Sequence, residues 1–184
     1  MLESALIAHG APTLARLKVG SAFAVPAGEG LCTEIDRLNG ELAPKGVRLT
    51  ALRVRDGRAL MYLYREAELA AALSQADVRA FLRSMGYAVF ETVAVLERLR
   101  LRLAQTEEFP HEIGVFLGYP LSDVIAYIRN GGRNCLCCGC WKVYSDEHGA
   151  RRTFARFRKC REVYARLFAQ GCPLSRLTVC TRAA

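Results

Sequence analysis

The chain has 184 residues, of which 52% are hydrophobic, so it can bury the core of one domain, and we expect residues 1–184 to form a single domain. No apolar run reaches the roughly 18 residues of a membrane span, and the N-terminus lacks a secretory signal pattern. We therefore expect a cytoplasmic protein with reduced thiols and no membrane partner. The net charge of +8 comes from scattered arginines, which favours a small anionic ligand over nucleic acid.

The first recognisable segment runs from His9 to Lys18. Proline suits the first turn of a helix, so we expect a helix to begin at Pro12 and to leave Lys18 free on its polar side. Backbone N–H groups at Gly10 and at the start of that helix would face an anion. His9 and Lys18 are therefore candidate ligand-binding residues, although a histidine in this setting equally fits a structural role.

Helix and strand patterns follow along the chain. Residues 25–30 are a loop by composition, and helical spacing of apolar residues predicts a helix over 31–42. Strands are predicted over 47–54 and 58–64, joined by Asp56-Gly57, because glycine tolerates the positive φ of a tight hairpin turn.

The second half alternates helices and short strands. Its predicted helices are 66–84, 89–105, a short one from Pro120 to Gly131-Gly132, and 146–170; its predicted strands are 112–117, 141–144 and 174–179. About five mostly antiparallel or mixed strands with five or six helices, outside a strict βαβ order, indicate the α+β class.

Four of the eight cysteines lie within six positions, as two overlapping C-x-x-C pairs. Cys135 pairs with Cys138, and Cys137 with Cys140. Zinc and iron–sulfur centres take thiolates from such turns, so these four are candidate zinc or iron ligands, with Cys160 as a further one. A redox-active dithiol is the second interpretation of the run. Cys160 also fits a small buried core residue.

The segment Phe109-Pro110-His111-Glu112 places a base beside a charged partner. We take His111, Glu112 and Cys138 as candidate catalytic residues. Neighbouring side chains of a strand point to opposite faces, however, so on a strand His111 and Glu112 would not enter one pocket.

Trp141 and Tyr144 offer stacking surface, while Lys142 and Lys18 offer positive charge. These four residues are candidates for binding a small anionic or aromatic ligand such as a nucleotide, a flavin or a haem.

Three sequence motifs of the chain, taken together, match the pattern of one known family. They are H-x-A-P-T-L-A from His9, P-H-E-I-G-V-F-L-G-Y-P from Pro110, and C-G-x-W-K-V-Y from Cys138. They resemble an uncharacterised bacterial family, a domain of unknown function frequent in anaerobic Firmicutes, whose signatures are P-H-E and L-G-Y-P. The resemblance covers nearly the whole chain. It implies a soluble single-domain protein and no particular reaction, and it adds Tyr119 to the ligand-binding candidates.

The chain departs from the pattern of that family in two places. Gly10 stands where the family is associated with a cysteine, and Cys135, Cys137 and Cys140 look like additions beside Cys138. From the sequence we predict a Cys/His-site protein that binds zinc or iron or carries a reactive thiol. The alternative is a binding module for a small anionic or aromatic ligand, and whether the protein is an enzyme stays open.

Overall fold

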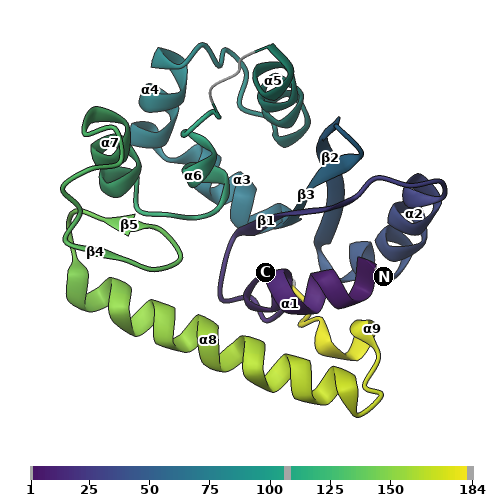
Figure 1. Cartoon of the computed structure of the whole chain (residues 1–184). Coiled ribbons are helices and arrows are strands. Elements are labelled where there is room, and N and C mark those ends of the chain that lie inside the picture. The colour runs from purple at the N-terminus through teal and green to yellow at the C-terminus, as the bar shows by residue number, and fades with distance from the viewer. Residues whose placement is uncertain (1, 106–108, 182–184) are drawn as a thin grey trace.

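A three-stranded antiparallel sheet lies at the centre of the molecule, with helices on both of its faces (Figure 1). The computed structural model describes residues 2–105 and 109–181. The strands are β1 (Gly20–Pro26), β2 (Val47–Arg55) and β3 (Arg58–Arg65), in the order β1-β3-β2. The predicted α+β class is confirmed, and the strand pairs are antiparallel, one of the two arrangements that the sequence left open. The described residues hold about five strands, as predicted, but nine α-helices and not five or six.

The central strand β3 separates two hydrophobic clusters. Met61 and Leu63 belong to the cluster on one face, and Tyr62 and Tyr64 belong to the cluster on the other. This follows from the strand period of two residues. Because both faces of β3 are covered, its inner residues form a continuous apolar run rather than an alternating pattern.

The turn between β2 and β3 has the predicted geometry. Asp56 and Gly57 adopt φ values of 51° and 67°, so both central positions are left-handed, as in the hairpin turn whose twist matches the flanking strands. The pairing holds from Arg55 and Arg58 to the far ends of the two strands, with one irregularity between Ala51 and Arg53.

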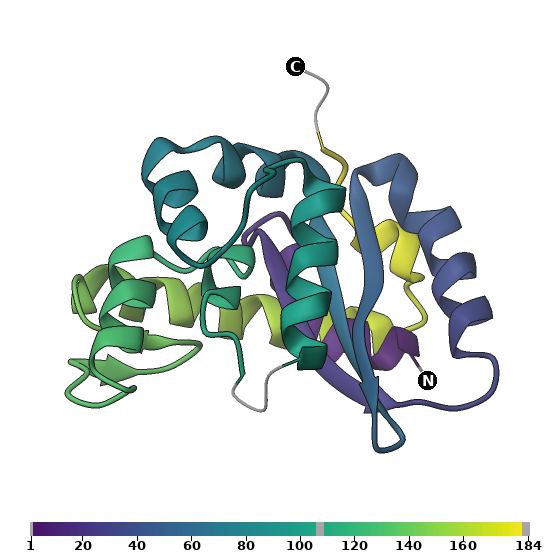
Figure 2. The same cartoon turned by 90° about the horizontal axis from the view of Figure 1, so that it is seen from above.

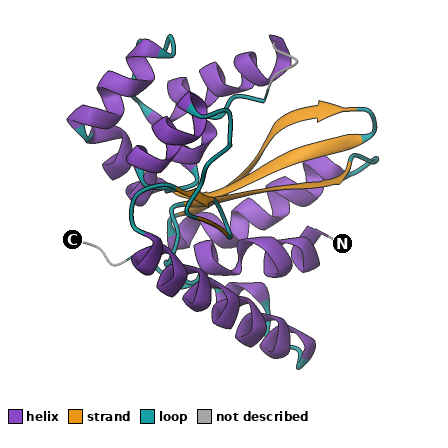
Figure 3. Cartoon of the chain, turned by 60° about the vertical axis from the view of Figure 1, so that its left-hand side comes forward, coloured by secondary structure: helices purple, strands orange, loops and turns teal. Residues whose placement is uncertain are grey.

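Nine α-helices occur in the described residues, and two views give their arrangement around the sheet (Figures 2 and 3). The helices are α1 (Leu2–Leu14), α2 (Leu31–Leu42), α3 (Glu66–Ser74), α4 (Ala76–Ser84), α5 (Thr92–Gln105), α6 (Ile113–Phe116), α7 (Leu121–Arg129), α8 (Glu147–Ala169) and α9 (Leu174–Leu177), with a 3-10 turn at Ala43–Lys45. A two-stranded hairpin, β4 (Cys137–Cys138) and β5 (Lys142–Val143), precedes the long helix α8, which packs against α1.

Two predicted strands are wrong, because they are helical turns. Residues 112–117 form α6, in which the amides of Gly114 and Val115 donate to the carbonyls of His111 and Glu112. All four residues of α6 are buried, and a short, fully buried apolar run has no periodicity that separates helix from strand. Residues 174–179 contain α9, which buries Leu174 and Leu177 one helical turn apart.

The predicted start of the first helix is also wrong. Helix α1 begins at Leu2, and Pro12 lies inside its last turn. Gly10 is therefore not part of an anion-binding loop. It packs closely against the sheet, since a Cβ there would lie 2.6 Å from Leu63 Cδ2. Burial of an apolar helix face against the sheet outweighs the hydrogen bond that proline removes.

Strands β1 and β4 were not predicted, and β1 includes two residues, Val25 and Pro26, that composition assigns to a loop. The segment 66–84 is two helices, separated at Gln75 by an extended backbone with ψ of 135°.

Candidate functional site

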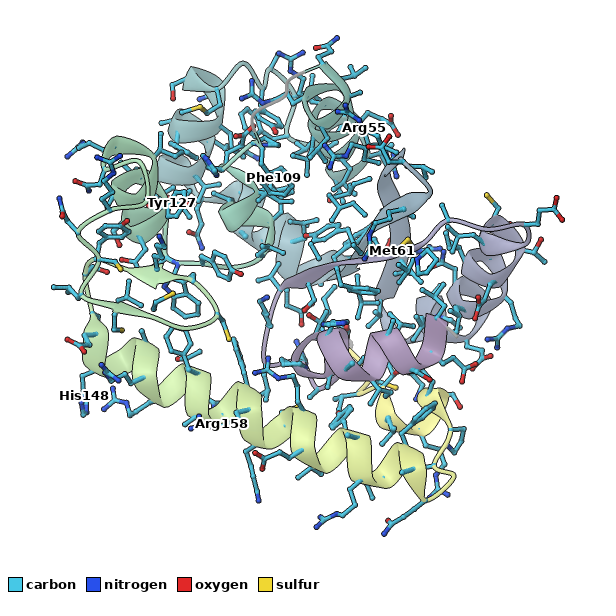
Figure 4. The ribbon with its side chains drawn as sticks, viewed as in Figure 1. Arg55, Met61, Phe109, Tyr127, His148 and Arg158 are labelled. Atoms are coloured by element: carbon cyan, nitrogen blue, oxygen red, sulfur yellow. The ribbon has the colours of Figure 1, made fainter. Side chains whose placement is uncertain are left out.

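A cavity of about 290 Å³ lies between α6, α7 and the β4–β5 hairpin. We call it the aromatic cavity. Four residues predicted from the sequence line it, and they come from three separate segments: His111, Tyr119, Trp141 and Lys142. Figure 4 shows the Tyr127 side chain on α7, in the same region as the hairpin, and Tyr127 is a further lining residue.

Asp123 of α7 organises this cavity, although it is only 2% exposed. Its Oδ2 accepts a hydrogen bond from Trp141 Nε1 at 2.8 Å. Its Oδ1 accepts from the amides of Tyr144 and Ser145, each at 2.9 Å, and from Ser145 Oγ at 2.8 Å. The four donors occupy both oxygens of the carboxylate, which fixes the indole ring and the chain after β5.

Sequence reasoning did not single out Asp123 as a site residue. The one feature of the sequence that could have pointed to Asp123 is its position in the first turn of a helix, next to the buried Val124. Its four donors lie in a different segment of the chain, so no spacing rule pointed to them.

A column of side chains continues from the aromatic cavity towards α8. The rings of Tyr119 and Trp141 stack with centroids 5.1 Å apart, and the rings of Trp141 and Phe154 of α8 meet in a T-shaped arrangement with centroids 4.6 Å apart. On Tyr119 lies the ammonium group of Lys18, 5.2 Å from the ring centroid. The Tyr119 hydroxyl donates to the Cys140 carbonyl at 2.9 Å. The column therefore joins four segments, and the indole at its centre contacts both Tyr119 and Phe154.

Lys18 is thus not free, in contrast to the prediction. Burial lowers its pKa to about 8, the thiol of Cys140 opposes that change, and the positive charge of Arg161 adds to it. Burial also raises the pKa of Tyr119 to about 12, so the tyrosine is a neutral hydrogen-bond donor at physiological pH.

Two basic side chains flank Tyr127 at the cavity. Lys142 Nζ lies 5.8 Å from the Tyr127 ring centroid and donates to the Gly132 carbonyl at 2.7 Å. The ring of His111 meets the Tyr127 ring edge-on at 4.9 Å, and His111 is exposed. Both basic groups therefore contact the same ring.

Glu112 does not line this cavity. It is 2% exposed, pairs with Arg102 and accepts a hydrogen bond from the Tyr87 hydroxyl at 3.1 Å. The separation of His111 and Glu112 agrees with the expectation that they do not share a pocket. It arises at the start of a helical turn and not from strand alternation.

Two further ligand-binding candidates lie outside the lining of the cavity. His9 is exposed on α1 and stacks on Phe23 of β1, with ring centroids 5.5 Å apart. Tyr144 contacts the site through its amide, which donates to Asp123, whereas its hydroxyl is buried and has no hydrogen-bond partner among the residues that the structure describes.

The four clustered cysteines occupy the hairpin with free thiols. Cys137 lies opposite Val143 and the exposed Cys138 lies opposite Lys142. Burial raises the pKa of Cys137, as do Glu147 and the thiols of Cys135 and Cys138, while Arg151 opposes the rise. Within residues 2–105 and 109–181, no three His, Cys, Asp or Glu side chains are grouped so that they could hold a metal ion.

Cys160 is buried in α8, 8% exposed, and burial raises the pKa of its thiol. This setting fits a core residue.

Among the described helices, none combines the length and the apolar character needed to cross a membrane. No curated protein and no solved structure matches the chain. The model of one family, described as protein of unknown function DUF3793, matches residues 6–178. The match spans nearly the whole chain, as the resemblance of its sequence phrases implies, and the chain belongs to the DUF3793 family.

Proposed function

We propose that the protein is a binding module for a small planar, anionic ligand, which occupies the aromatic cavity. The observation that carries this proposal is the convergence of Tyr127, Trp141 and Lys142 on one cavity of about 290 Å³. Ligand sites are mostly apolar concavities with a few well-placed polar groups. The volume lies at the small end of their usual range, which favours a ligand of one or two rings over a haem or a dinucleotide.

The electrostatics of the cavity support an anionic ligand. The Asp123 carboxylate uses both oxygens for hydrogen bonds to protein donors, so its charge is already stabilised. Lys142 uses one of its three ammonium protons for the Gly132 carbonyl and has two left to offer. A negative group beside Tyr127 would therefore lie near Lys142 and His111, which both contact that ring.

Replacement of Lys142 by methionine tests this proposal. We expect the affinity for an anionic aromatic ligand to fall about tenfold, which corresponds to one charge-assisted hydrogen bond. The fluorescence of Trp141, the one tryptophan of the chain, reports binding during titration with flavin mononucleotide, nucleoside monophosphates and aromatic carboxylates. Thermal melting of the same mixtures gives an independent measure.

Arg133→Met is the matched control, because Arg133 is exposed and carries the same charge. It should keep the wild-type affinity. The proposal is wrong if no compound of the panel changes the fluorescence or the melting temperature, or if both variants weaken binding equally.

The hairpin supports a second candidate function, a redox-active dithiol. The observation in its favour is that Cys138 is exposed while the pKa of Cys137 responds to the thiols of Cys135 and Cys138. Two thiols of a C-x-x-C pair that come into contact form a disulfide when an added disulfide oxidant accepts their two electrons and they release two protons. A zinc or iron ion on the same thiols, the other version predicted from the sequence, lacks this support, because the described residues group no three side chains that could hold an ion.

We expect Cys138 to react with iodoacetamide at least about tenfold faster than Cys160, which is shielded by burial. Mass spectrometry of peptides from the folded protein gives the rate at each thiol. Cys32, exposed on α2, is the matched control for plain accessibility.

The dithiol proposal is rejected by two results together. Cys138 would react with iodoacetamide no faster than Cys32, and mild oxidation would not lower the mass of the protein by two hydrogens. Zinc and iron analysis of protein prepared without oxygen decides the metal version, which predicts about one equivalent per chain.

A further inference from the structure

A second cavity, of about 530 Å³, lies between the chain that follows α6 and the first turns of α8. We call it the α8 cavity. Its lining includes Trp141 of the hairpin and two basic residues of α8, Arg152 and Arg156. Trp141 and Asp123 also line the aromatic cavity, so the two cavities adjoin at these two residues. The α8 cavity is the larger of the two.

The two arginines bring unused hydrogen-bond donors to the α8 cavity. Arg152 and Arg156 are four residues apart, so they project from the same side of the helix with Cβ atoms about 6 Å apart. Neither forms a hydrogen bond or an ion pair with any residue that the structure describes. Glu147, in the first turn of the same helix, pairs with Arg151 instead. Two guanidinium groups without a protein acceptor therefore line one cavity.

The other polar groups of the lining donate to the protein itself. The Gly149 amide, in the first turn of α8, donates to Asp146 Oδ1 at 2.9 Å. The Ser145 hydroxyl donates to Asp123 at 2.8 Å, and the Thr153 hydroxyl donates to the Gly149 carbonyl at 3.0 Å. A serine or threonine hydroxyl has a single proton to donate. Binding of an anion in this cavity therefore depends on the two guanidinium groups.

Asp146 gives the α8 cavity an acceptor as well. Its Oδ1 holds the Gly149 amide, whereas its Oδ2 accepts no hydrogen bond from a residue in the described part of the chain. A carboxylate oxygen repels an anion but accepts a hydrogen bond from a hydroxyl group. Trp141 adds apolar surface, against which the C–H groups of a ligand can pack. The cavity thus combines cationic donors, an anionic acceptor and an apolar wall.

We propose that the α8 cavity binds a phosphorylated sugar or polyol. The phosphate accepts hydrogen bonds from Arg152 and Arg156, because a guanidinium group donates paired hydrogen bonds to phosphate oxygens. The hydroxyl groups of the ligand donate to Asp146, which a bare phosphate ion cannot use. The cavity volume lies within the usual range of small-molecule sites. This site stands on its own lining and does not depend on a ligand in the aromatic cavity.

Isothermal titration calorimetry with ribose 5-phosphate tests the site, with ribose and inorganic phosphate as comparison compounds at constant ionic strength. Ribose 5-phosphate has no aromatic ring, so it does not suit the stacking surface of the aromatic cavity. We expect it to bind about tenfold more tightly than inorganic phosphate, because it adds a hydrogen bond to Asp146. Ribose, which lacks the phosphate, should not bind measurably.

Variants of α8 separate a site from general attraction to a basic helix. Arg152→Gln and Arg156→Gln should each weaken the binding of ribose 5-phosphate about tenfold, the effect of losing a charge-assisted hydrogen bond. Neither arginine has a partner among the described residues, so the melting temperature without ligand should not change. Arg158→Gln is the control of equal charge, because Arg158 is exposed on the same helix but does not line the cavity (Figure 4).

Asp146→Asn tests the part of the proposal that concerns the hydroxyl groups. It removes the charge that repels phosphate and strengthens the hydrogen bond to a hydroxyl group, so the preference for ribose 5-phosphate over inorganic phosphate should shrink. An unchanged preference would show that Asp146 does not contact the ligand and would overturn this part.

The proposal as a whole is overturned if ribose 5-phosphate at millimolar concentration produces no binding heat and no rise in melting temperature, or if it binds no better than inorganic phosphate. It is also overturned if Arg158→Gln weakens binding as much as Arg156→Gln. Lys142→Met should bind ribose 5-phosphate as the wild type does, and Arg156→Gln should keep the affinity for aromatic anions. Failure of the aromatic cavity and failure of the α8 cavity therefore give different results.

Discussion

Replacement of Arg65 by methionine is expected to lower the free energy of unfolding by about 3–5 kcal/mol, the scale of losing several charge-assisted hydrogen bonds. Arg65 is fully buried, and its guanidinium donates to the carbonyls of Thr13 and Leu14 at 2.6 Å and of Val179 at 2.7 Å. The first two are the last carbonyls of α1, which no residue of the helix can satisfy. Methionine fills a similar volume but removes all three of these charge-assisted hydrogen bonds. The Thr13 and Leu14 oxygens keep the amides of Arg16 and Val179 as donors, whereas the Val179 oxygen loses the guanidinium that it accepts from.

Urea denaturation gives the measurement, and Arg48→Met provides its control. Arg48 is exposed and pairs with Glu66 at the surface at 3.1 Å, so its loss should cost at most about 1 kcal/mol. Equal losses for the two variants would show that the network around Arg65 contributes no more than a surface ion pair.

Replacement of Asp123 by alanine should be nearly as costly and should also disrupt the aromatic cavity. It leaves Trp141 Nε1 and the amides of Tyr144 and Ser145 without their acceptor, and each unpaired buried donor costs about 1–3 kcal/mol. We expect a total loss of about 4 kcal/mol, a shifted Trp141 emission spectrum as water reaches the ring, and no ligand-dependent change in fluorescence.

Asp146→Ala is the matched control for Asp123. Asp146 also accepts a backbone hydrogen bond, from Gly149 at 2.9 Å, but it is an exposed cap at the start of α8. Its removal should cost about 1 kcal/mol and leave the emission spectrum unchanged. A melting temperature for Asp123→Ala no lower than that of Asp146→Ala would show that Asp123 does not organise the cavity.

Local rules predicted the elements that local interactions stabilise. The β2–β3 hairpin follows from Asp56-Gly57, whose left-handed φ values the structure confirms. Helix α8 follows from its apolar period and its terminal signals, and it begins with Asp146 as its capping residue and ends before Gly171. In these elements propensity, turn chemistry and burial all favour one conformation.

Local rules failed where tertiary packing decides the backbone. Residues Ile113–Phe116 are buried on all sides, so their apolar run satisfies a strand and a helix equally well. By local rules alone, Pro12 indicates the start of a helix. In the folded chain it lies in the last turn of a helix that packing against the sheet stabilises. In both cases a contact distant in the sequence outweighs a weak local preference.

The sequence by itself determined the motifs of the family, the β2–β3 hairpin and most of the helices. It also identified four of the residues that line the aromatic cavity. Tertiary structure alone decided how they combine: Asp123 as the acceptor for the segment after β5, Glu112 in an ion pair away from the cavity, and Lys18 on the ring of Tyr119. The physical reason is that hydrogen bonds and ring contacts between distant segments depend on how the chain packs around its sheet, and no spacing along the chain encodes that packing.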